Sequence, residues 1–379
     1  MPSAFWRRFG TSCCVALAAC ADPSATDISP TDSPAGGAGG SSGEGGSGNG
    51  GASGGGGAGG SESCAYQSVA ANLDAALFSI SASSPDDLYA CGARDASGPL
   101  FYHFDGAAWT RIDTSALDFD LWWMWDDGAG TIWAAGGHGE VARYDIASGS
   151  FSSEAVGDPA LVFFGIWGSS PTDVWLVGTD PNLNVAGGIY HYDGTTWSLA
   201  ATPTPTPSGT ERGAFKVWGR SATDVYVVGT GALSMHWDGA TWTDQDSPLF
   251  EGTTIFTVSG DASGTVAVGG QGNGAAQSWS ADSATLTDIT PAPTQLAPGF
   301  VGVFDHPSFD PVASTAAGSV WRFSGGAWAP DTCAPATTSG LHAVWVDDNG
   351  GIWAVGGDLS ALDHGVIVYA GELTLPSIP

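Results

Sequence analysis

Three stretches of the sequence are copies of one another: FFGIWGSSPTDVWLVG (residues 163–178), AFKVWGRSATDVYVVG (residues 214–229) and LFSISASSPDDLYACG (residues 77–92). Four more divergent copies span residues 121–137, 255–270, 300–315 and 341–357. The aligned anchor positions of the copies are Ile80, Trp125, Trp167, Trp218, Ser259, Phe304 and Trp345. Their mean spacing is about 44 residues, which is the length of a four-stranded propeller blade.

Turn chemistry divides each unit into strands. An apolar strand ends near the anchor, a turn rich in Ser, Pro and Asp follows, and a second β-rich strand comes next. The Asp before that strand (Asp87, Asp173, Asp224) is expected to accept hydrogen bonds from backbone amides of the turn. A second signature, as in YHYDGTTW (residues 190–197), places Asp-Gly in the next tight turn. The sequence therefore predicts an all-β fold: a seven-bladed β-propeller with four-stranded blades.

Blades of this kind cannot bury both faces alone, so they stack around an axis and large aromatic side chains fill the gaps. This packing accounts for most of the 17 Trp residues. The segment from Tyr66 to Asn72 resembles the last strand of a repeat, so we expect it beside the C-terminal blade. The histidines His103, His191 and His236 occupy equivalent repeat positions, which favours packing over metal binding.

The repeats resemble those of bacterial secreted propeller proteins with W-G-S-S-x-x-D-V-W-x-V-G units, a group often described as BNR-like repeat proteins. Residues 126–133 and 347–353 also resemble the periplasmic sensor propeller repeats of two-component regulators. Both resemblances imply a propeller fold. Neither implies a catalytic site, because the matching residues are turn and packing positions.

The N-terminus has the pattern of an export signal: Arg7 and Arg8 precede a short run of small and apolar residues. Leu-Ala-Ala-Cys ending at Cys20 resembles the lipobox of bacterial lipoproteins, which implies lipidation at Cys20; ordinary signal cleavage is the alternative. We expect a signal peptide at 1–19, a lipid-anchored, disordered Gly/Ser-rich linker at 20–63 and the propeller at 64–379. The expected location is the cell envelope, at the outer membrane or cell surface.

The composition is strongly acidic, with 39 Asp and Glu against 9 Lys and Arg. Removing the signal would leave a net charge near −32. Nucleic acid and anionic headgroups are therefore excluded as partners, because binding either needs clustered basic residues. The acidity favours solubility and repulsion between copies, with calcium or a cationic ligand as the alternative.

Three cysteines lie outside the signal and lipobox: Cys64, Cys91 and Cys333. Cys91 occupies a position that other repeats fill with Val or Ala, so it is expected to be a buried thiol. Cys64 and Cys333 lie in connecting segments of an exported chain and are predicted to form a disulfide. No Cys/His spacing typical of a zinc site is present, and no metal or cofactor is predicted.

Two classes of function compete. A sialidase-like hydrolase would need three converging arginines, and the arginines are scattered over the repeats; other hydrolases with paired carboxylates stay open. A non-catalytic binding module for a glycan or protein fits better, because loops that break the repeat are where propellers place recognition. An accessory subunit of a surface complex is a further alternative.

The repeat-breaking loops span residues 179–188, 201–213 and 357–365, and both connection types involved should open on one face. Tolerated surface insertions are the alternative explanation. Trp123 and Trp125 share one side of an innermost strand and could stack on a ligand, although packing between blades is the alternative. Histidines 138, 306, 342 and 364 also break the repeat. The candidate ligand-binding residues are Trp123, Trp125, Asn182, Asn184, Arg212, Asp358 and His364.

Overall fold

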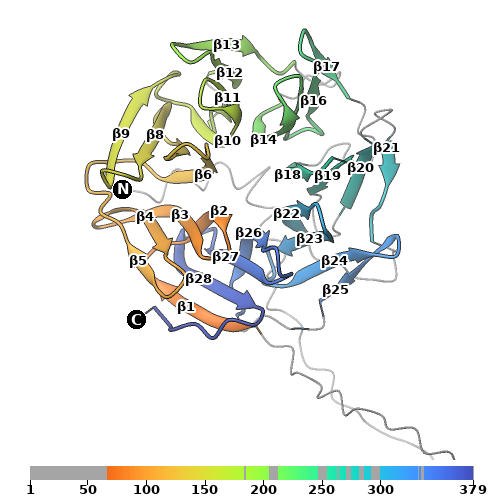
Figure 1. The fold of residues 1–379 in the computed structure, drawn as a ribbon. Coiled ribbons are helices and arrows are strands. Elements are labelled where there is room, and N and C mark those ends of the chain that lie inside the picture. Colours follow the sequence, from red (N-terminus) through yellow and green to blue (C-terminus); the bar gives the residue numbers. More distant parts are fainter. Residues whose placement is uncertain are drawn as a thin grey trace, which may run out of the picture.

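The computed structural model describes residues 66–182, 185–204, 212–245, 254–262, 264–269, 275–280, 286–291, 299–331, 333 and 337–378. These residues form strands and turns only, in seven four-stranded antiparallel sheets, one for each sequence repeat. The sheets are arranged as blades around a central axis (Figure 1). The all-β propeller with four-stranded blades is confirmed. The predicted signal and linker, including Cys20, lie outside the described residues.

The first four blades follow the chain in order. Blade 1 contains β2 (Leu77–Ser84), β3 (Asp87–Asp95), β4 (Gly98–Phe104) and β5 (Trp109–Arg111). Blade 2 contains β6 (Leu121–Asp126), β7 (Thr131–Gly136), β8 (Glu140–Asp145) and β9 (Ser150–Ala155). Blade 3 contains β10 (Val162–Ser170), β11 (Asp173–Thr179), β12 (Gly188–Tyr192) and β13 (Trp197–Ala201). Blade 4 contains β14 (Ala214–Ser221), β15 (Asp224–Gly229), β16 (Ser234–Trp237) and β17 (Trp242–Asp244).

The remaining blades complete the ring. Blade 5 contains β18 (Ile255–Gly260), β19 (Gly264–Gly269), β20 (Ala275–Ser280) and β21 (Leu286–Asp288). Blade 6 contains β22 (Phe300–His306), β23 (Phe309–Thr315), β24 (Val320–Ser324) and β25 (Ala327–Pro330). Blade 7 contains β26 (Gly340–Val346), β27 (Ile352–Asp358), β28 (Asp363–Ala370) and β1 (Gln67–Leu73).

Strand β1 closes the ring, because the first strand of the chain becomes the outermost strand of the last blade. It pairs antiparallel with β28, from Gln67 opposite Tyr369 to Leu73 opposite Gly365. Figure 1 shows β1 beside β28, with the C-terminus nearby. The C-terminal tail then returns along β1, where the Ile378 amide donates to the carbonyl oxygen of Val69 at 2.7 Å. The predicted placement of this segment is confirmed.

The antiparallel order gives the ring two different faces. The loop face carries the connections between blades and the turns between the second and third strands of each blade. The turn face carries the turns between the first and second strands and between the third and fourth strands. The three repeat-breaking loops all belong to the loop face, as expected. Residues 183–184 and 205–211 of these loops lie outside the described residues.

Adjacent blades pack through aromatic side chains from the second strand of one blade and the third and fourth strands of the next. Trp175 of blade 3 contacts Trp237 and Trp242 of blade 4, with ring centroids 5.5 and 5.2 Å apart. Trp353 of blade 7 contacts Phe104 and Trp109 of blade 1 in the same way, at 5.3 and 5.7 Å. The repeated Trp and Asp-Gly signatures therefore encode the contacts between blades.

Strand register corrects one anchor of the repeat. Trp167 lies opposite Trp175, and the equivalent pair in blade 1 is Ser81 opposite Tyr89. The anchor of the first repeat is therefore Ser81 and not Ile80. An alignment centred on aromatic and large apolar residues missed it because Ser81 is small and polar.

Candidate functional site

The turn face carries a polar unit that recurs from blade to blade. His103, His191 and His236 each place Nε2 2.6–2.7 Å from Oδ1 of Asp87, Asp173 and Asp224, respectively. Each imidazole also stacks on an aromatic ring of the second strand, at 4.3–4.5 Å between centroids. The packing role predicted for these histidines agrees with the stacked geometry.

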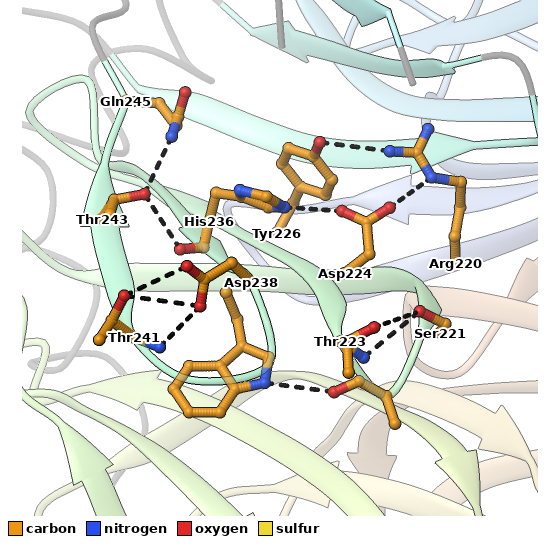
Figure 2. A network of polar contacts seen from close by, with 12 residues as sticks. Arg220, Ser221, Thr223, Asp224, Tyr226, His236, Asp238, Thr241, Thr243 and Gln245 are labelled. Carbon is orange, nitrogen blue, oxygen red and sulfur yellow. Dashed lines mark hydrogen bonds and ion pairs between the residues drawn. The ribbon is translucent and has the colours of Figure 1, made fainter. Parts of the chain in front are cut away.

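Figure 2 shows the version of this unit in blade 4. Asp224 lies between His236 and Arg220, whose Nε is 2.5 Å from Oδ2, and the Arg220 guanidinium also reaches the Tyr226 hydroxyl at 3.4 Å. The second oxygens of Asp87 and Asp173 instead accept from Ser83 and Ser169. The expectation that these aspartates bind backbone amides was wrong: side chains of the same blade supply their donors.

The Asp-Gly turns on the same face behave as expected. Asp105, Asp193 and Asp238 each accept two backbone amides of the residues that follow, at 2.7–3.0 Å. These hydrogen bonds hold the pKa of each carboxyl below its ordinary value. The glycines after them have φ between 84° and 92°, a conformation that favours glycine. The polar groups of the turn face are thus committed to blade architecture.

The innermost strands place a ring of side chains at the axis. Each of these strands has a register shift after its first or second paired residue, so the bulged residue leaves the ladder. We call these bulged residues the collar: Phe78, Trp122, Phe164, Phe215, Phe256, Val301 and His342. Five neighbouring pairs in it have ring centroids 4.2–6.5 Å apart. Aromatic packing therefore surrounds the axis near the loop face.

A cluster of charged side chains lies on the loop face beside the collar. The Arg94 amide donates to Oδ1 of Asp120 at 2.8 Å, and the Arg94 guanidinium donates to the Asp118 carbonyl oxygen at 2.5 Å. His138, in the turn between β7 and β8, places Nδ1 3.7 Å from Oδ1 of Asp118. Asp120 directly precedes β6 and hence the collar residue Trp122. We call Arg94, Asp118, Asp120 and His138 the loop-face cluster.

The members of this cluster differ in burial. The side chains of Asp118 and His138 are 78% and 59% exposed, which leaves them free to reach a ligand. Burial raises the pKa of the Asp120 carboxyl, although the Arg94 amide and the charges of Arg94 and His138 act in the opposite direction. A guanidinium, an imidazole and two carboxyl groups together provide donors and acceptors for hydroxyl groups or for a polar peptide.

Backbone strain also concentrates on the loop face. The described non-glycine residues with positive φ are Asn72, His138, Ala232, Leu362 and His364, with φ between 52° and 61°. All of them lie in or beside turns of this face, whereas the positive φ values of the turn face belong to glycine. Left-handed backbone at non-glycine residues is costly and recurs at binding and active sites.

The structure places the predicted ligand-binding residues at several points. Trp123 lies inside the propeller, and Nζ of Lys216 is 3.7 Å from the centroid of its indole ring. The Trp125 ring packs against Gly168 of blade 3, which matches the packing alternative. Arg212 is 8% exposed and its guanidinium binds Asp244 and the Ala232 carbonyl oxygen, so it is already engaged.

The other predicted residues lie on the loop face in separate blades. The Asn182 amide donates to Oδ1 of Asp180 at 2.7 Å, and Asn184 lies outside the described residues. Asp358 accepts the amides of Ser360 and Ala361 and so closes the turn before β28. His364 is 60% exposed and places Nδ1 2.5 Å from Asp363. Among the candidates that the structure describes, only Asp358 and His364 share one loop.

The sequence did not indicate three members of the loop-face cluster, Arg94, Asp118 and Asp120, or the axial lysine. Asp118 and Asp120 lie in an inter-blade connection that the repeats do not align, so no periodic signal marked them. Lys216 carried a usable signal, because the other copies place Ser, Trp, Gly, Thr, Gly or Ala at its position. His138 was noted as breaking the repeat, and the structure gives it Asp118 as a partner.

The arginines and cysteines bear on the remaining alternatives. Each of five arginines binds a different carboxylate in the described structure, so no shared carboxylate brings three of them to one point: Arg111, Arg143, Arg212, Arg220 and Arg322. Cys91 is a free, fully buried thiol, as predicted. Cys333 is buried and disulfide-bonded, while Cys64 lies outside the described residues, so their pairing stays a prediction.

The described residues contain neither a cluster of metal-binding side chains nor a helix that could span a membrane. Within the described ranges, no group of three or more His, Cys, Asp or Glu side chains is placed to hold a metal ion. The part of the chain that the structure describes also contains no helix of the length and apolarity needed to span a bilayer.

Comparisons with known proteins identify the fold and no family. No family model and no curated protein sequence matches the chain. Among solved structures, virginiamycin B lyase from Staphylococcus aureus, a catalytically inactive variant with quinupristin, has a TM-score of 0.64 at 12% identity, covering 81% of this chain and 99% of that one. YCF48 from Cyanidioschyzon merolae has a TM-score of 0.58 at 14% identity, covering 81% and 98%.

A third similar structure is the extracellular domain of the putative hybrid two-component system BT3049 from B. thetaiotaomicron. Its TM-score is 0.58 at 13% identity, and the match covers 81% of this chain and 42% of that one. At these identities the likeness establishes a shared β-propeller fold alone.

Proposed function

We propose that this protein is a lipid-anchored cell-surface propeller that binds a glycan or protein ligand through its loop face and does not convert it. The observation that carries the proposal is the difference between the two faces. Among the described residues, polar groups of the turn face recur in several blades and bind one another, whereas the loop-face cluster occurs once and two of its side chains are largely exposed. Residues of a binding site are expected to differ between repeats, whereas residues of the blade architecture recur with the repeat.

The path of the chain supports the same assignment. Gln67, at the start of β1, lies opposite Tyr369, at the end of the pairing remote from the loop face. An N-terminal tether would therefore join the propeller at the turn face and leave the loop face pointing outward. Such a tether of about forty Gly/Ser-rich residues has a reach of roughly 35 Å, enough to clear a membrane surface.

Capture assays test the ligand face. The mature chain carrying Cys20→Ser would be applied to a glycan array and used in a cell-surface pull-down, together with Asp120→Asn and His138→Ala. We expect each substitution to reduce capture about tenfold or more, because each removes a group that converges on the cluster. Asp86→Asn, in a turn of the opposite face, is the matched control and should capture like the parent.

Equal capture by the parent and both loop-face variants would contradict this assignment. Multiple turnover of a sialoside, or of any member of a polysaccharide panel, would contradict the non-catalytic part. Loss of that turnover in Asp120→Asn would then favour a hydrolase that uses the buried carboxyl as a general acid.

Incorporation of palmitate tests the anchor. The wild-type chain should take up radiolabelled palmitate and enter the detergent phase, whereas Cys20→Ala should do neither, because the thioether to the lipid forms at that cysteine. Equal labelling of both chains would refute lipidation at Cys20.

A further inference from the structure

The sequence contains a single lysine, Lys216, and the propeller buries it at its centre. Lys216 lies on β14 of blade 4, next to the collar residue Phe215, and is 5% exposed. Its Nζ donates to the Phe164 carbonyl oxygen of blade 3 at 2.7 Å and lies 3.7 Å from the ring centroid of Trp123 in blade 2. The amine thus crosses from its own blade toward the axis.

Two more blades contribute groups that interact electrostatically with this amine. Cys91 belongs to blade 1 and His342 to blade 7. A side chain that interacts with blades 1, 2, 3 and 7 while rooted in blade 4 lies close to the axis that all blades share. In the described part of the chain, the hydrogen bonds and ring contacts of Lys216 and His342 are with carbonyl oxygens and aromatic rings and not with carboxylates.

This lack of a carboxylate matters in a chain with 39 acidic residues. A buried ammonium without a counter-charge is costly, and burial accordingly drives the pKa of Lys216 well below its ordinary value. One carbonyl oxygen and one aromatic face accept from the amine, which leaves donor capacity unused when it is protonated. Protonation would therefore be favoured by an anion that arrives at the axis.

We propose that Lys216 is the charge-binding group of a ligand site on the propeller axis, and that this site takes a ligand bearing a carboxylate. The inference rests on the proposed binding function and adds the class of ligand to it. A single ammonium beside the Trp123 ring matches a planar monoanion, whereas a phosphate or sulfate dianion would need more donors. The carboxylate belongs either to a small free acid or to an acidic sugar of a glycan.

Binding takes up a proton from solvent, since the neutral amine becomes an ammonium paired with the carboxylate. The other titratable groups facing the amine do not change charge near neutral pH. Burial and the nearby Lys216 charge lower the pKa of His342 to about 3, with Nδ1 bound to the Phe78 carbonyl oxygen at 2.6 Å. Burial raises the pKa of the Cys91 thiol above its ordinary range. The pH dependence of binding therefore belongs to Lys216.

Calorimetry on the mature Cys20→Ser chain tests the proposal. The probes are glucuronate, its uncharged amide, and a glucuronate-containing oligosaccharide. We expect glucuronate or the oligosaccharide to bind at least tenfold more tightly than the amide, with uptake of about one proton per ligand in buffers of different ionisation enthalpy. Affinity should fall about tenfold per pH unit above the pKa of the free amine. Which of the two acids binds more tightly identifies the source of the carboxylate.

Two variants separate a ligand group from a structural one. Lys216→Met keeps nearly the length of the side chain and should abolish both the preference for the acid and the proton uptake. Arg322→Met, on the outer part of blade 6, should change neither. Equal affinity of Lys216→Met and wild type for glucuronate, or binding without proton uptake, would overturn the proposal. Absence of binding by every acid would overturn it as well.

The single lysine allows a direct readout that does not depend on how the variant folds. Reductive methylation with ¹³C-formaldehyde should give one ε-dimethylamine NMR resonance that shifts on adding glucuronate; a native protein that resists the reagent would contradict access to the axis. Unchanged capture by Asp120→Asn and His138→Ala, with Lys216-dependent binding of glucuronate intact, would refute only the loop-face function. Reduced capture by the two loop-face variants, with no effect of Lys216→Met on glucuronate binding, would refute only the axial site.

Discussion

The glycine after the inner-strand anchor of blades 3, 4 and 5 is required by the preceding blade. A Cβ built on Gly168, Gly219 or Gly260 would lie 2.5–2.7 Å from Cη2 of a tryptophan in the preceding blade, namely Trp125, Trp167 or Trp218. Where the preceding blade has Ser81 or Ser259 at the tryptophan position, the glycine position holds Asp126 or Asp305. Volume at one blade and space at the next therefore vary together at these five boundaries, whereas Ala82 occupies the glycine position next to Trp345 of blade 7.

Gly219→Ala tests this complementarity. The added methyl group would lie 2.7 Å from the Trp167 ring, so we expect a loss of about 1–3 kcal/mol in the free energy of unfolding. In Trp167→Leu the ring is absent, and Gly219→Ala should cost less there, although the Asp224 carbonyl oxygen at 2.8 Å keeps part of the strain. Denaturant unfolding of the four chains measures the coupling. Additive costs would show that the tryptophan is not the group that excludes the methyl.

Asp305 makes stability depend on pH. Burial, with the nearby charges of Asp261 and Asp310, raises the pKa of its carboxyl to about 7. Between the ordinary value near 4 and this value, the folded chain holds a proton that the unfolded chain has released. The contribution of Asp305 to the free energy of unfolding is therefore fully present below about pH 4 and is lost as pH rises through 7.

Asp305→Asn should remove this dependence, because the amide stays neutral at every pH. Thermal melts from pH 4 to 8 should show the variant gaining stability over wild type as pH rises, with the largest gain at pH 8. Asp310→Asn, which removes a neighbouring charge, should shift the same transition of Asp305 to lower pH. A constant difference between Asp305→Asn and wild type across the range would contradict the assignment.

At the scale of the element, the third strand of blades 1 to 4 carries the side chain that covers the aromatic ring of the second strand. His191 stacks on Trp175 at 4.3 Å, and Arg143 lies over Trp133 at 4.0 Å in the equivalent place of blade 2. The aromatic ring of the second strand is thus packed between its own blade and the next blade. Substitution at this position acts on the packing of strands and not on the loop face.

His191→Ala should therefore destabilise the fold while leaving capture unchanged. Loss of the hydrogen bond to Asp173 and of the stack is expected to cost about 1–2 kcal/mol, because both side chains are only partly exposed. His364→Ala, which replaces an exposed histidine of the loop face, is the control and should leave the melting temperature nearly unchanged. Weaker capture by His191→Ala at a temperature where it stays folded would assign this unit to ligand binding.

The sequence predicts strands well here because turn residues and aromatic anchors recur with a fixed period. The hairpins, the Asp-Gly turns and the closing position of Tyr66 to Asn72 all followed from that repeat. It could not predict the bulge of the innermost strands, since Phe78 and Phe164 read as ordinary apolar residues until the register places them off the ladder. The sequence also could not predict the loop-face cluster, because Asp118 and Asp120 belong to no repeat and no periodic signal marks them.

At the scale of the whole molecule, ring closure depends on one strand. The side chains of Val69, Ala70 and Leu73 on β1 are 1%, 2% and 8% exposed, and they belong to the core that contains Ile367 and Trp353. Without β1, the outer edge of β28 and part of this core would meet solvent. The seam lies between the two ends of the chain, so it joins the residues most distant in sequence.

Deleting residues 67–73 should consequently lower the melting temperature and make blade 7 the first site of proteolysis. Deleting residues 372–379 removes only the tail that lines β1 and should have a smaller effect, because the pairing of β1 with β28 remains. A circular permutant that carries residues 66–76 after the C-terminal strand restores the same sheet with a different connection and should recover most of the loss. Limited proteolysis with mass spectrometry locates the first cleavage in each chain. If cleavage of the deletion variant began in another blade, or the permutant melted no higher than the deletion, the seam would not be the part of the ring that determines its stability.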